Sequence, residues 1–366
     1  MGNEHGMTSR SQRVLKIRNW INQYDSCFIA TDTYAIRWLT GFTGSNGLLF
    51  LDQNHMTLFT DSRYENQAAI ELARFGAKSN CVVGPNPMRS IADLSKGKNI
   101  FIDSEKCSWA KKEEIESQIE GEIVDAHDFC FSLRGIKDKS EIDKIKTAAE
   151  ITCRALDRSL AELDEQTTEK ELAGKIEYYM ALEGASNVAY PPIVAAGSNS
   201  ALPHARPTGQ RILTQDILLV DIGANYKGYC SDMTRMIPLS TMSAEQKHVS
   251  QIVLDAQRKA IEAIRPGIMA KEIDGICRDA LNDKGFGDRF LHGTGHGVGL
   301  EIHEFPRINS RSEDLIQEGM VITVEPGIYL EDSFGIRWED LFLVTDTGVE
   351  YLTNYGKLTQ LDETQG

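Results

Sequence analysis

The 366-residue sequence has little positive charge and no long apolar run. It contains 39 lysines and arginines against 54 aspartates and glutamates, a formal net charge of −15. Such a surface repels nucleic acids and anionic membranes. No apolar stretch approaches the roughly eighteen residues that cross a bilayer, and the N-terminus has no apolar signal region. We therefore expect neither a nucleic acid nor a membrane partner, and we predict a cytoplasmic protein.

Cysteine is sparse and lacks the spacing of a metal or redox motif. The seven cysteines are scattered, and no two of them are separated by two residues. An odd number of scattered cysteines indicates free thiols in a reducing compartment. The glycine-rich segment GFTGSNG lacks the Gly-Lys-Ser/Thr of a phosphate loop, so we interpret it as a turn in a domain core.

Periodicity and turn residues divide the chain into two predicted domains. Residues 10–132 mix strand-like runs, such as CFIATD and GLLFLD, with helical stretches, which indicates an α/β domain. Residues 133–366 begin with a helix for which Ser140 is the predicted cap. In both halves of this region helices precede strands. These strands are predicted to carry His204 and the acidic residues described in the next paragraph, so we predict an α+β domain of two related halves. The predicted helices cover about residues 140–164, 169–183, 243–264 and 270–284.

Four acids and one histidine in the second domain form a candidate metal site. Each lies in a predicted strand or a glycine-rich loop and not on a solvated helix. Buried charges without partners are costly, so these acids require a cation among them. Oxygen-rich ligands with one imidazole and no thiolate favour two divalent cations, with Mn²⁺ expected first and Co²⁺, Fe²⁺ or Zn²⁺ as alternatives. The five candidate ligands are Asp221, Asp232, His296, Glu325 and Glu339.

The segment LLVDIGANYKGYCSDMT is predicted to form a hairpin that joins the first two acids. A turn centred between Tyr226 and Lys227 places Asp221 directly opposite Asp232, although a bulge at Gly228 would shift this register. Like charges directly opposite each other destabilise a sheet. The pairing therefore indicates a shared cation.

The segment VITVEPGIYLEDSFGIRWEDLFLV is predicted to form a second hairpin, centred at Asp332. This register places Glu325 opposite Glu339. The two-residue period of a strand puts Arg337 on the face of Glu339 and turns Trp338 away.

Three of the eight histidines lie close together in FLHGTGHGVGLEIHE. His292 and His296 have the spacing of a helical zinc motif, but glycines surround them and no glutamate follows the first, so we reject that interpretation. The alternating glycines instead allow the backbone to approach a metal or substrate closely. The cluster predicts a functional site.

These segments resemble a known family. GTGHGVGLEIHE, TVEPGIY, GIRWEDL and VDIGANYKGYCSDMTR are similar to the signature segments of the M24 metallopeptidases, which have the pita-bread fold, and most of all to its Xaa-Pro aminopeptidases and Xaa-Pro dipeptidases (prolidases). WLTGFTGSNGLLFL and LFTDSRYENQA resemble the creatinase-like N-terminal domain of those enzymes. The resemblance implies a creatinase-like α/β domain in residues 10–132 and a pita-bread catalytic domain in residues 133–366.

The resemblance also implies roles for individual residues. It places the metal ligands on the five residues named above. In the expected mechanism, Glu325 or another of the ligand carboxylates takes a proton from the attacking water. Catalytic histidines fall on His204, His292 and His303, and Tyr329 and Arg337 hold the ligands in place. His303 and His204 are expected to stabilise the oxyanion and the nitrogen on the proline side.

The expected reaction is two-metal hydrolysis of the bond between an N-terminal residue and a following proline. A dipeptidase must bind its substrate's free carboxylate, and Arg307 and Arg311 are the available arginines. The stretch before EPG is acidic at Glu313, Asp314 and Glu318, which favours an Xaa-Pro aminopeptidase, with an Xaa-Pro dipeptidase as the alternative. A metal-free creatinase-like hydrolase and a non-catalytic binding module fit less well, because all five ligands are present. The expected partners are peptides with proline at the second position and, from the resemblance, a second copy of the chain in a homodimer.

Overall fold

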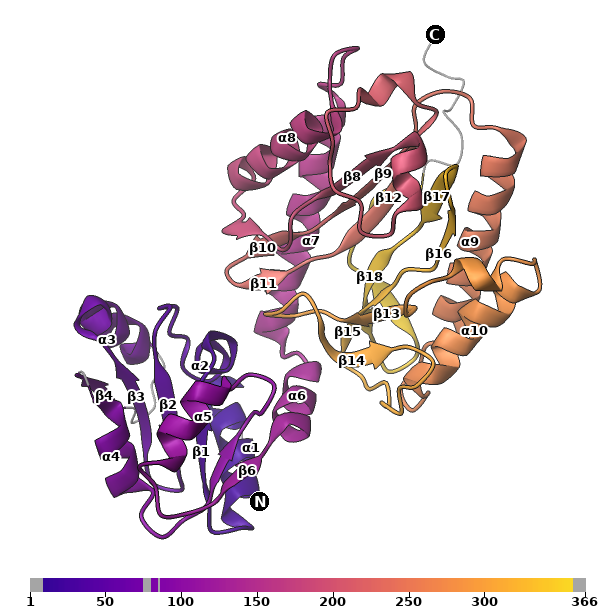
Figure 1. Ribbon diagram of the computed structural model, residues 1–366. Coiled ribbons are helices and arrows are strands. Elements are labelled where there is room, and N and C mark those ends of the chain that lie inside the picture. Colours follow the sequence, from indigo (N-terminus) through magenta and orange to yellow (C-terminus); the bar gives the residue numbers. More distant parts are fainter. Residues whose placement is uncertain (1–8, 75–79, 85, 358–366) are drawn as a thin grey trace. The chain divides into compact units, whose positions relative to one another are not determined.

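The computed structural model describes residues 9–74, 80–84 and 86–357 (Figure 1). The chain divides into two compact units, Met1–Phe131 and Ser132–Gly366. The first eight residues, part of the N-terminus in which no apolar signal region was expected, lie outside the described residues. Among the described helices, none has the length and apolar character that a membrane crossing requires.

The first unit is built on one six-stranded sheet with the order β4-β3-β2-β1-β5-β6. The pairs β1–β2 and β2–β3 are antiparallel, whereas β3–β4, β1–β5 and β5–β6 are parallel. Strands β1 and β2 are buried along their whole length, which explains why their sequences, CFIA and LLFL, are continuously apolar. The strands are β1 (Cys27–Ala30), β2 (Leu48–Leu51), β3 (Met56–Thr60), β4 (Asn80–Val83), β5 (Ile100–Ile102) and β6 (Ile123–Asp125). The α-helices up to the end of this unit are α1 (Ser9–Asn22), α2 (Thr33–Thr40), α3 (Glu65–Ala73), α4 (Pro87–Leu94), α5 (Trp109–Glu116) and α6 (His127–Gly135), the last of which continues into the second unit.

Two pairs of long helices frame the second unit, as predicted. Their ends lie within about four residues of the expected ones. Capping boxes fix three of the helix starts, because a side chain at the cap and one three residues later satisfy each other's backbone N–H groups. Ser243 caps its helix as expected, but Asp138, and not Ser140, caps the first helix, with Glu141 completing the box. The helices are α7 (Lys139–Leu160), α8 (Glu169–Leu182), α9 (Ala244–Ala263) and α10 (Ala270–Asn282).

The strands of the second unit form one five-stranded sheet, two three-stranded sheets and one two-stranded sheet, with the orders β14-β13-β15-β18-β19, β12-β9-β8, β11-β10-β7 and β16-β17. The strands before α9 are β7 (Asn187–Val188), β8 (Ile193–Ala196), β9 (Ile217–Ile222), β10 (Ala224–Tyr226), β11 (Tyr229–Cys230) and β12 (Met233–Pro238). Those after α10 are β13 (Gly295–Gly297), β14 (Glu304–Ile308), β15 (Val321–Val324), β16 (Gly327–Leu330), β17 (Phe334–Arg337), β18 (Asp340–Val344) and β19 (Val349–Tyr351).

Each helix pair buries its apolar face against strands. Figure 1 shows α7 and α8 on one side of the strands and α9 and α10 on the other. One apolar cluster joins α7 and α8 to β8, β9 and β12, and includes Leu156, Ile176 and Val220. A second joins α9 and α10 to the later strands, and includes Val253, Ile273 and Ile322. The polar residues of the candidate site lie between these two cores, Asp221 and His296 within strands β9 and β13 and Asp232, Glu325 and Glu339 next to strand ends.

Candidate metal centre

The first hairpin carries its two acids on one face, in a register that differs from the predicted one. Asp221 on β9 pairs with Thr234 on β12, and not with Asp232. The turn is centred between Lys227 and Gly228, whose φ angles are 49° and 89°, one residue later than expected. Both angles suit a two-residue hairpin turn that requires positive φ. A one-residue shift of the centre moves each partner by two residues, so the acids keep a common face and become diagonal neighbours.

The second hairpin confirms the predicted register. Its three-residue loop is centred at Asp332, whose φ is 58°. Paired residues flank the two glutamates on both sides, Val324 with Asp340 and Gly327 with Arg337, which places Glu325 opposite Glu339. Pro326 has no N–H for a ladder hydrogen bond, and both glutamates lie where the ladder is interrupted.

Neighbouring residues in this hairpin face opposite sides, as the strand period predicted. Trp338 is 1% exposed and its Nε1 donates to Ser250 Oγ on α9 at 3.0 Å. Arg337 points the other way, where its Nη2 donates to Asp221 Oδ2 and its Nε to Thr234 Oγ1 at 3.0 Å. One arginine thus ties the second hairpin to the first.

His296 lies in β13, between β14 and β15, and the glycines beside it explain how the strands fit. A Cβ on Gly295 would lie 2.1 Å from the carbonyl oxygen of Thr323, and one on Gly297 would lie 2.1 Å from that of Phe305. Only glycine allows this close approach of the backbones. The segment is therefore not helical, as expected.

An ion pair on α10 supports the segment that leads into β13. Asp274 is fully buried, and its Oδ1 accepts from Thr294 N at 3.0 Å and Thr294 Oγ1 at 2.9 Å. Arg278 pairs with Asp274 and donates to the carbonyl oxygen of His292 at 2.5 Å. The carbonyl oxygen of Thr294 in turn accepts from Glu325 N at 2.8 Å. Nothing in the local spacing of the sequence pointed to this support.

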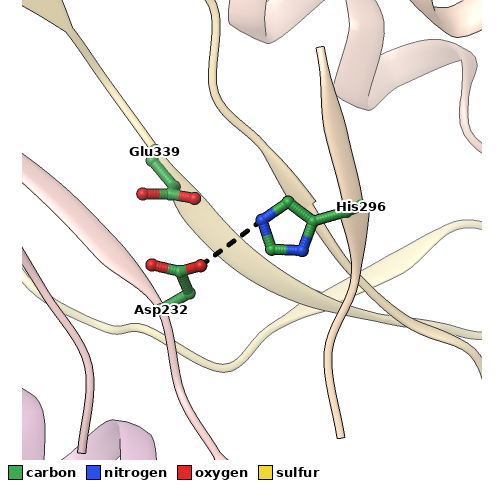
Figure 2. Close-up of side chains that lie close together, drawn as sticks. All are labelled: Asp232, His296 and Glu339. Atoms are coloured by element: carbon green, nitrogen blue, oxygen red, sulfur yellow. Dashed lines mark ion pairs between the residues drawn. The ribbon is translucent and has the colours of Figure 1, made fainter. Parts of the chain in front are cut away.

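The predicted ligands converge. Donor atoms of Asp232, His296 and Glu339 all lie within 4.8 Å of one another, and Figure 2 shows the three side chains directed at a common point from separate segments. His296 Nε2 lies 3.5 Å from Asp232 Oδ2 and 3.5 Å from Glu325 Oε1. Asp221 joins this group through Tyr190, whose Oη lies within hydrogen-bonding distance of both Asp221 and Asp232.

Burial and mutual repulsion perturb the pKa values of these groups. Burial raises the pKa of Asp232, Glu325 and Glu339 well above the usual carboxyl values, and neighbouring carboxylates raise each further. Burial, followed by the nearby His303, lowers the pKa of His296 to about 3. The protein alone thus opposes charge on its carboxyls and a proton on its imidazole. A cation at the same point reverses the preference for the carboxylates and needs a neutral imidazole as a ligand.

The tautomer of His296 provides a geometric test of whether a metal fits. Its Nδ1 lies 3.0 Å from the carbonyl oxygen of Gly297, which only accepts hydrogen bonds, so Nδ1 carries the proton. The lone pair of Nε2 therefore faces the oxygens of Asp232 and Glu325. Three acceptors directed at one point repel one another unless a cation lies between them. The donor set of four carboxylates and one imidazole thus fits divalent ions.

Tyr329 and His292 extend the contacts of Arg337 to the cavity. Arg337 Nη1 donates to Tyr329 Oη at 2.8 Å, and Tyr329 Oη lies 2.9 Å from His292 Nε2. His292 Nδ1 lies 2.8 Å from the carbonyl oxygen of Gly293. Burial, followed by the positive charge of Arg337, lowers the pKa of His292 to about 4. The ring is therefore neutral at pH 7, with its proton on Nδ1, and its Nε2 accepts from the tyrosine.

A cavity of about 700 Å³ opens onto this cluster. All five predicted ligands line it, together with His204, His292, His303 and Arg337, whereas Tyr329 is not among the lining residues. His204 lies in a turn after a short 3₁₀ helix (Gly197–Ala201), and not in a strand as predicted. The rest of the wall is largely apolar, with Arg206 and Arg307 also present; its apolar residues are Pro191, Pro192, Ile193, Pro203, Ala205, Pro207, Ile302 and Ile308. This combination of apolar walls and a few convergent polar groups is typical of a small-molecule site.

Sequence reasoning missed two residues of the cluster. Tyr190 lies 31 positions before Asp221, and no spacing in the sequence connects the two. Thr234 Oγ1 donates to Glu339 Oε2 at 2.7 Å. The two-residue period could have found Thr234, since it follows Asp232 by two residues and so faces the same side.

Both domains match known families. Residues 143–346 match the family model of metallopeptidase family M24, and residues 13–136 match that of the creatinase/prolidase N-terminal domain. An Xaa-Pro dipeptidase of Pyrococcus furiosus is 36% identical over 95% of this chain and 98% of its own length. Among solved structures, an Xaa-Pro dipeptidase from Bacillus anthracis has a TM-score of 0.89 at 30% identity, covering 95% of this chain and 99% of that one. An X-Pro aminopeptidase from Thermotoga maritima has a TM-score of 0.83 at 34% identity, covering 91% and 96%.

These matches confirm the predicted fold, a creatinase-like α/β domain followed by a pita-bread domain. They also agree with the metal-binding chemistry of the convergent acids and histidine. The chain belongs to metallopeptidase family M24.

Proposed function

We propose that this protein is an Xaa-Pro dipeptidase, which hydrolyses dipeptides with proline as the second residue. The sequence alone favoured an Xaa-Pro aminopeptidase, but full-length relatives named Xaa-Pro dipeptidase favour the alternative. The observation that carries the proposal is the position of Arg307. It pairs directly with His296 across β14 and β13 and lines the cavity, so its side chain shares a face with a metal ligand.

Arg307 is suited to bind the free carboxylate that distinguishes a dipeptide. A guanidinium recognises a carboxylate through two parallel hydrogen bonds, and the proline end of a dipeptide carries that carboxylate close to the scissile bond. Arg311, the other arginine considered from the sequence, is not among the residues that line the cavity. The acidic residues that favoured an aminopeptidase, Glu313, Asp314 and Glu318, are also not among them.

The five ligands are proposed to hold two divalent ions. Asp221 would bind one ion, His296 and Glu325 the other, and Asp232 and Glu339 would contact both. When bound, such ions supply Lewis-acid polarisation of the scissile carbonyl and lower the pKa of water. Mn²⁺ and a homodimer stay predictions, open to metal analysis and to light scattering against the chain mass of 40.8 kDa.

The remaining residues bind and orient the substrate and move protons. Glu325 is proposed to take the proton of the attacking water. His303 and His204 line the cavity and are proposed to donate to the developing oxyanion and to interact with the proline nitrogen. Arg337 holds Asp221 and Tyr329, which fixes the direction of the first carboxylate. The apolar wall excludes water around the proline ring.

Substrate length tests the proposal. We expect kcat/KM for Ala-Pro to exceed that for Ala-Pro-Ala by tenfold or more, which corresponds to about 1.4 kcal/mol of transition-state binding. Arg307→Met is expected to lower kcat/KM for Ala-Pro by about 10- to 100-fold, because one charged hydrogen-bonding partner is lost. Arg311→Met serves as the matched control and should leave kcat/KM unchanged for both Ala-Pro and Ala-Pro-Ala.

The opposite preference would establish the second candidate, an Xaa-Pro aminopeptidase, which the similarity to the Thermotoga maritima enzyme favours. In that case Ala-Pro-Ala would be the better substrate by tenfold or more, and Arg307→Met would leave its cleavage unchanged.

Metal removal should destabilise the protein. Chelation leaves the buried carboxylates of the cluster without a cation, so we expect the free energy of unfolding to fall. The difference is about 2.7 kcal/mol when the metal concentration is a hundredfold above its Kd. Urea unfolding with and without Mn²⁺ measures it. Identical unfolding curves, together with no metal bound in equilibrium dialysis, would remove the metal centre from the proposal.

A further inference from the structure

A buried carboxylate on α8, far from the metal ligands in sequence, has an unusual set of partners. Glu169 is the first residue of α8, after the cap Thr168, and its side chain is fully buried. Burying a carboxylate is costly unless hydrogen bonds replace its water. The donors that Glu169 receives come from one segment, residues 196–208, which we term the His204 loop.

The carboxylate binds both ends of this loop. Its Oε1 accepts from Ala196 N at 2.7 Å, and its Oε2 accepts from Thr208 N at 2.8 Å and Thr208 Oγ1 at 2.7 Å. Asn199 Nδ2 donates to Oε2 at 2.9 Å and lies 3.4 Å from the carbonyl oxygen of Arg206. Donors separated by twelve positions in the chain thus meet on one side chain.

The backbone of α8 adds to this attachment. Lys170 N donates to the carbonyl oxygen of Thr208, and Glu169 N to that of Gln210, both at 3.1 Å. Gln210 Nε2 also donates to the carbonyl oxygen of Ala196 at 3.2 Å. The N-terminus of α8, where orphan N–H groups need acceptors, is therefore the base on which the loop closes.

The middle of the loop faces the metal centre. His204 lines the cavity. Arg337 Nη1 donates to the carbonyl oxygen of Pro203 at 3.1 Å, and Gly335 N donates to Ser200 Oγ at 2.9 Å. The loop is thus held at its ends by Glu169 and near its middle by β17. A histidine in a turn has no strand ladder to fix it, so these attachments hold the backbone on which its ring is carried.

We propose that Glu169 is a positioning residue that holds His204 in its catalytic place by closing the base of the His204 loop. This inference rests on the role of His204 under the proposed function. Glu169→Gln should break hydrogen bonds at the base of the loop. At either oxygen position the new amide NH₂ is a donor, and it would face the N–H donors of Ala196, Asn199 or Thr208, which need an acceptor. A displacement of about 1 Å at a catalytic group costs up to about 100-fold in rate.

The test compares four variants of the full chain with Mn²⁺ bound. Glu169→Gln is expected to lower kcat for Ala-Pro by about 10- to 100-fold while the metal content is unchanged, since no ligand lies on the loop. Glu171→Gln is the matched control. It removes the capping acid of the same helix, whose Oε2 accepts from Thr168 N at 2.7 Å, without touching the loop, and should retain full activity. Hydrogen exchange should show faster exchange of the Ala196 and Thr208 amides only in Glu169→Gln.

His204→Ala and the double variant separate positioning from general stability. If Glu169 acts through His204, then Glu169→Gln causes no further loss of kcat when His204 is already alanine, whereas independent effects multiply. A His204→Ala enzyme with normal activity would refute the proposed role of His204, and this inference with it. An impaired His204→Ala beside a normal Glu169→Gln, or multiplied losses in the double variant, would overturn this inference alone. Should Glu169→Gln fail to fold, Asn199→Ala removes one link and is expected to give a smaller loss of kcat with metals retained; unchanged kcat would count against the proposal.

Discussion

Replacing Glu339 by glutamine is expected to abolish hydrolysis and to lower the occupancy of both metal ions. Glu339 lies opposite Glu325, and a donor oxygen of Glu339 lies within 4.8 Å of donor atoms of Asp232 and His296, so it is proposed to contact both ions. Glutamine keeps the size of the side chain but removes the charge and one acceptor. We expect kcat/KM to fall by about 10³-fold or more, equivalent to about 4 kcal/mol of transition-state stabilisation.

Metal analysis beside the activity assay separates the possible causes. The expected result is loss of both bound ions and of activity, with a folded protein that Mn²⁺ no longer stabilises against urea. Glu318→Gln is the control, since Glu318 is exposed and does not line the cavity. Full activity with two bound ions in Glu339→Gln would remove Glu339 from the site.

The two hairpins show what the sequence can and cannot specify about this site. The second register was predicted correctly because its loop is centred on one residue, Asp332, and the apolar strands on both sides are of matching length. The first was wrong by two positions, since the choice of Lys227 and Gly228 as turn residues depends on which residues take positive φ. The prediction that both acids share one face of the hairpin was still correct, because the side-chain period of a strand is two.

The residues that hold the site segments in place could not be predicted from local sequence patterns. Tyr190, Glu169 and Asp274 each contact site segments from another part of the chain. Their sequence surroundings are ordinary for a loop or a helix, so no periodicity or spacing marks them. Glu169 and Asp274 would be expected on an exposed helix face, and only the tertiary fold shows that both are fully buried. The convergence of the candidate ligands was predictable, because acids in buried strands are rare unless they are paired.

The last prediction concerns His303, which is expected to act on the substrate and not on the metal ions. Its ring lies 4.4 Å from that of His296, centroid to centroid, at an interplanar angle of 79°, and it lines the cavity. Burial, followed by the nearby His204, lowers the pKa of His303, so the ring is neutral at pH 7 and has one N–H to donate. A donor placed where negative charge develops typically contributes 10²- to 10³-fold to the rate.

His303→Ala should therefore lose about 10²- to 10³-fold in kcat while it retains both metal ions and the Mn²⁺-dependent stability. Retention is expected because the cluster of Asp232, His296 and Glu339 does not include His303. His248→Ala, at an exposed position on α9 outside the cavity lining, is the control for the loss of an imidazole. An unchanged rate would exclude His303 from the reaction. Loss of metal would instead indicate that His303 is a metal ligand. Its packing against the His296 ring would then have to be reinterpreted as part of the metal centre.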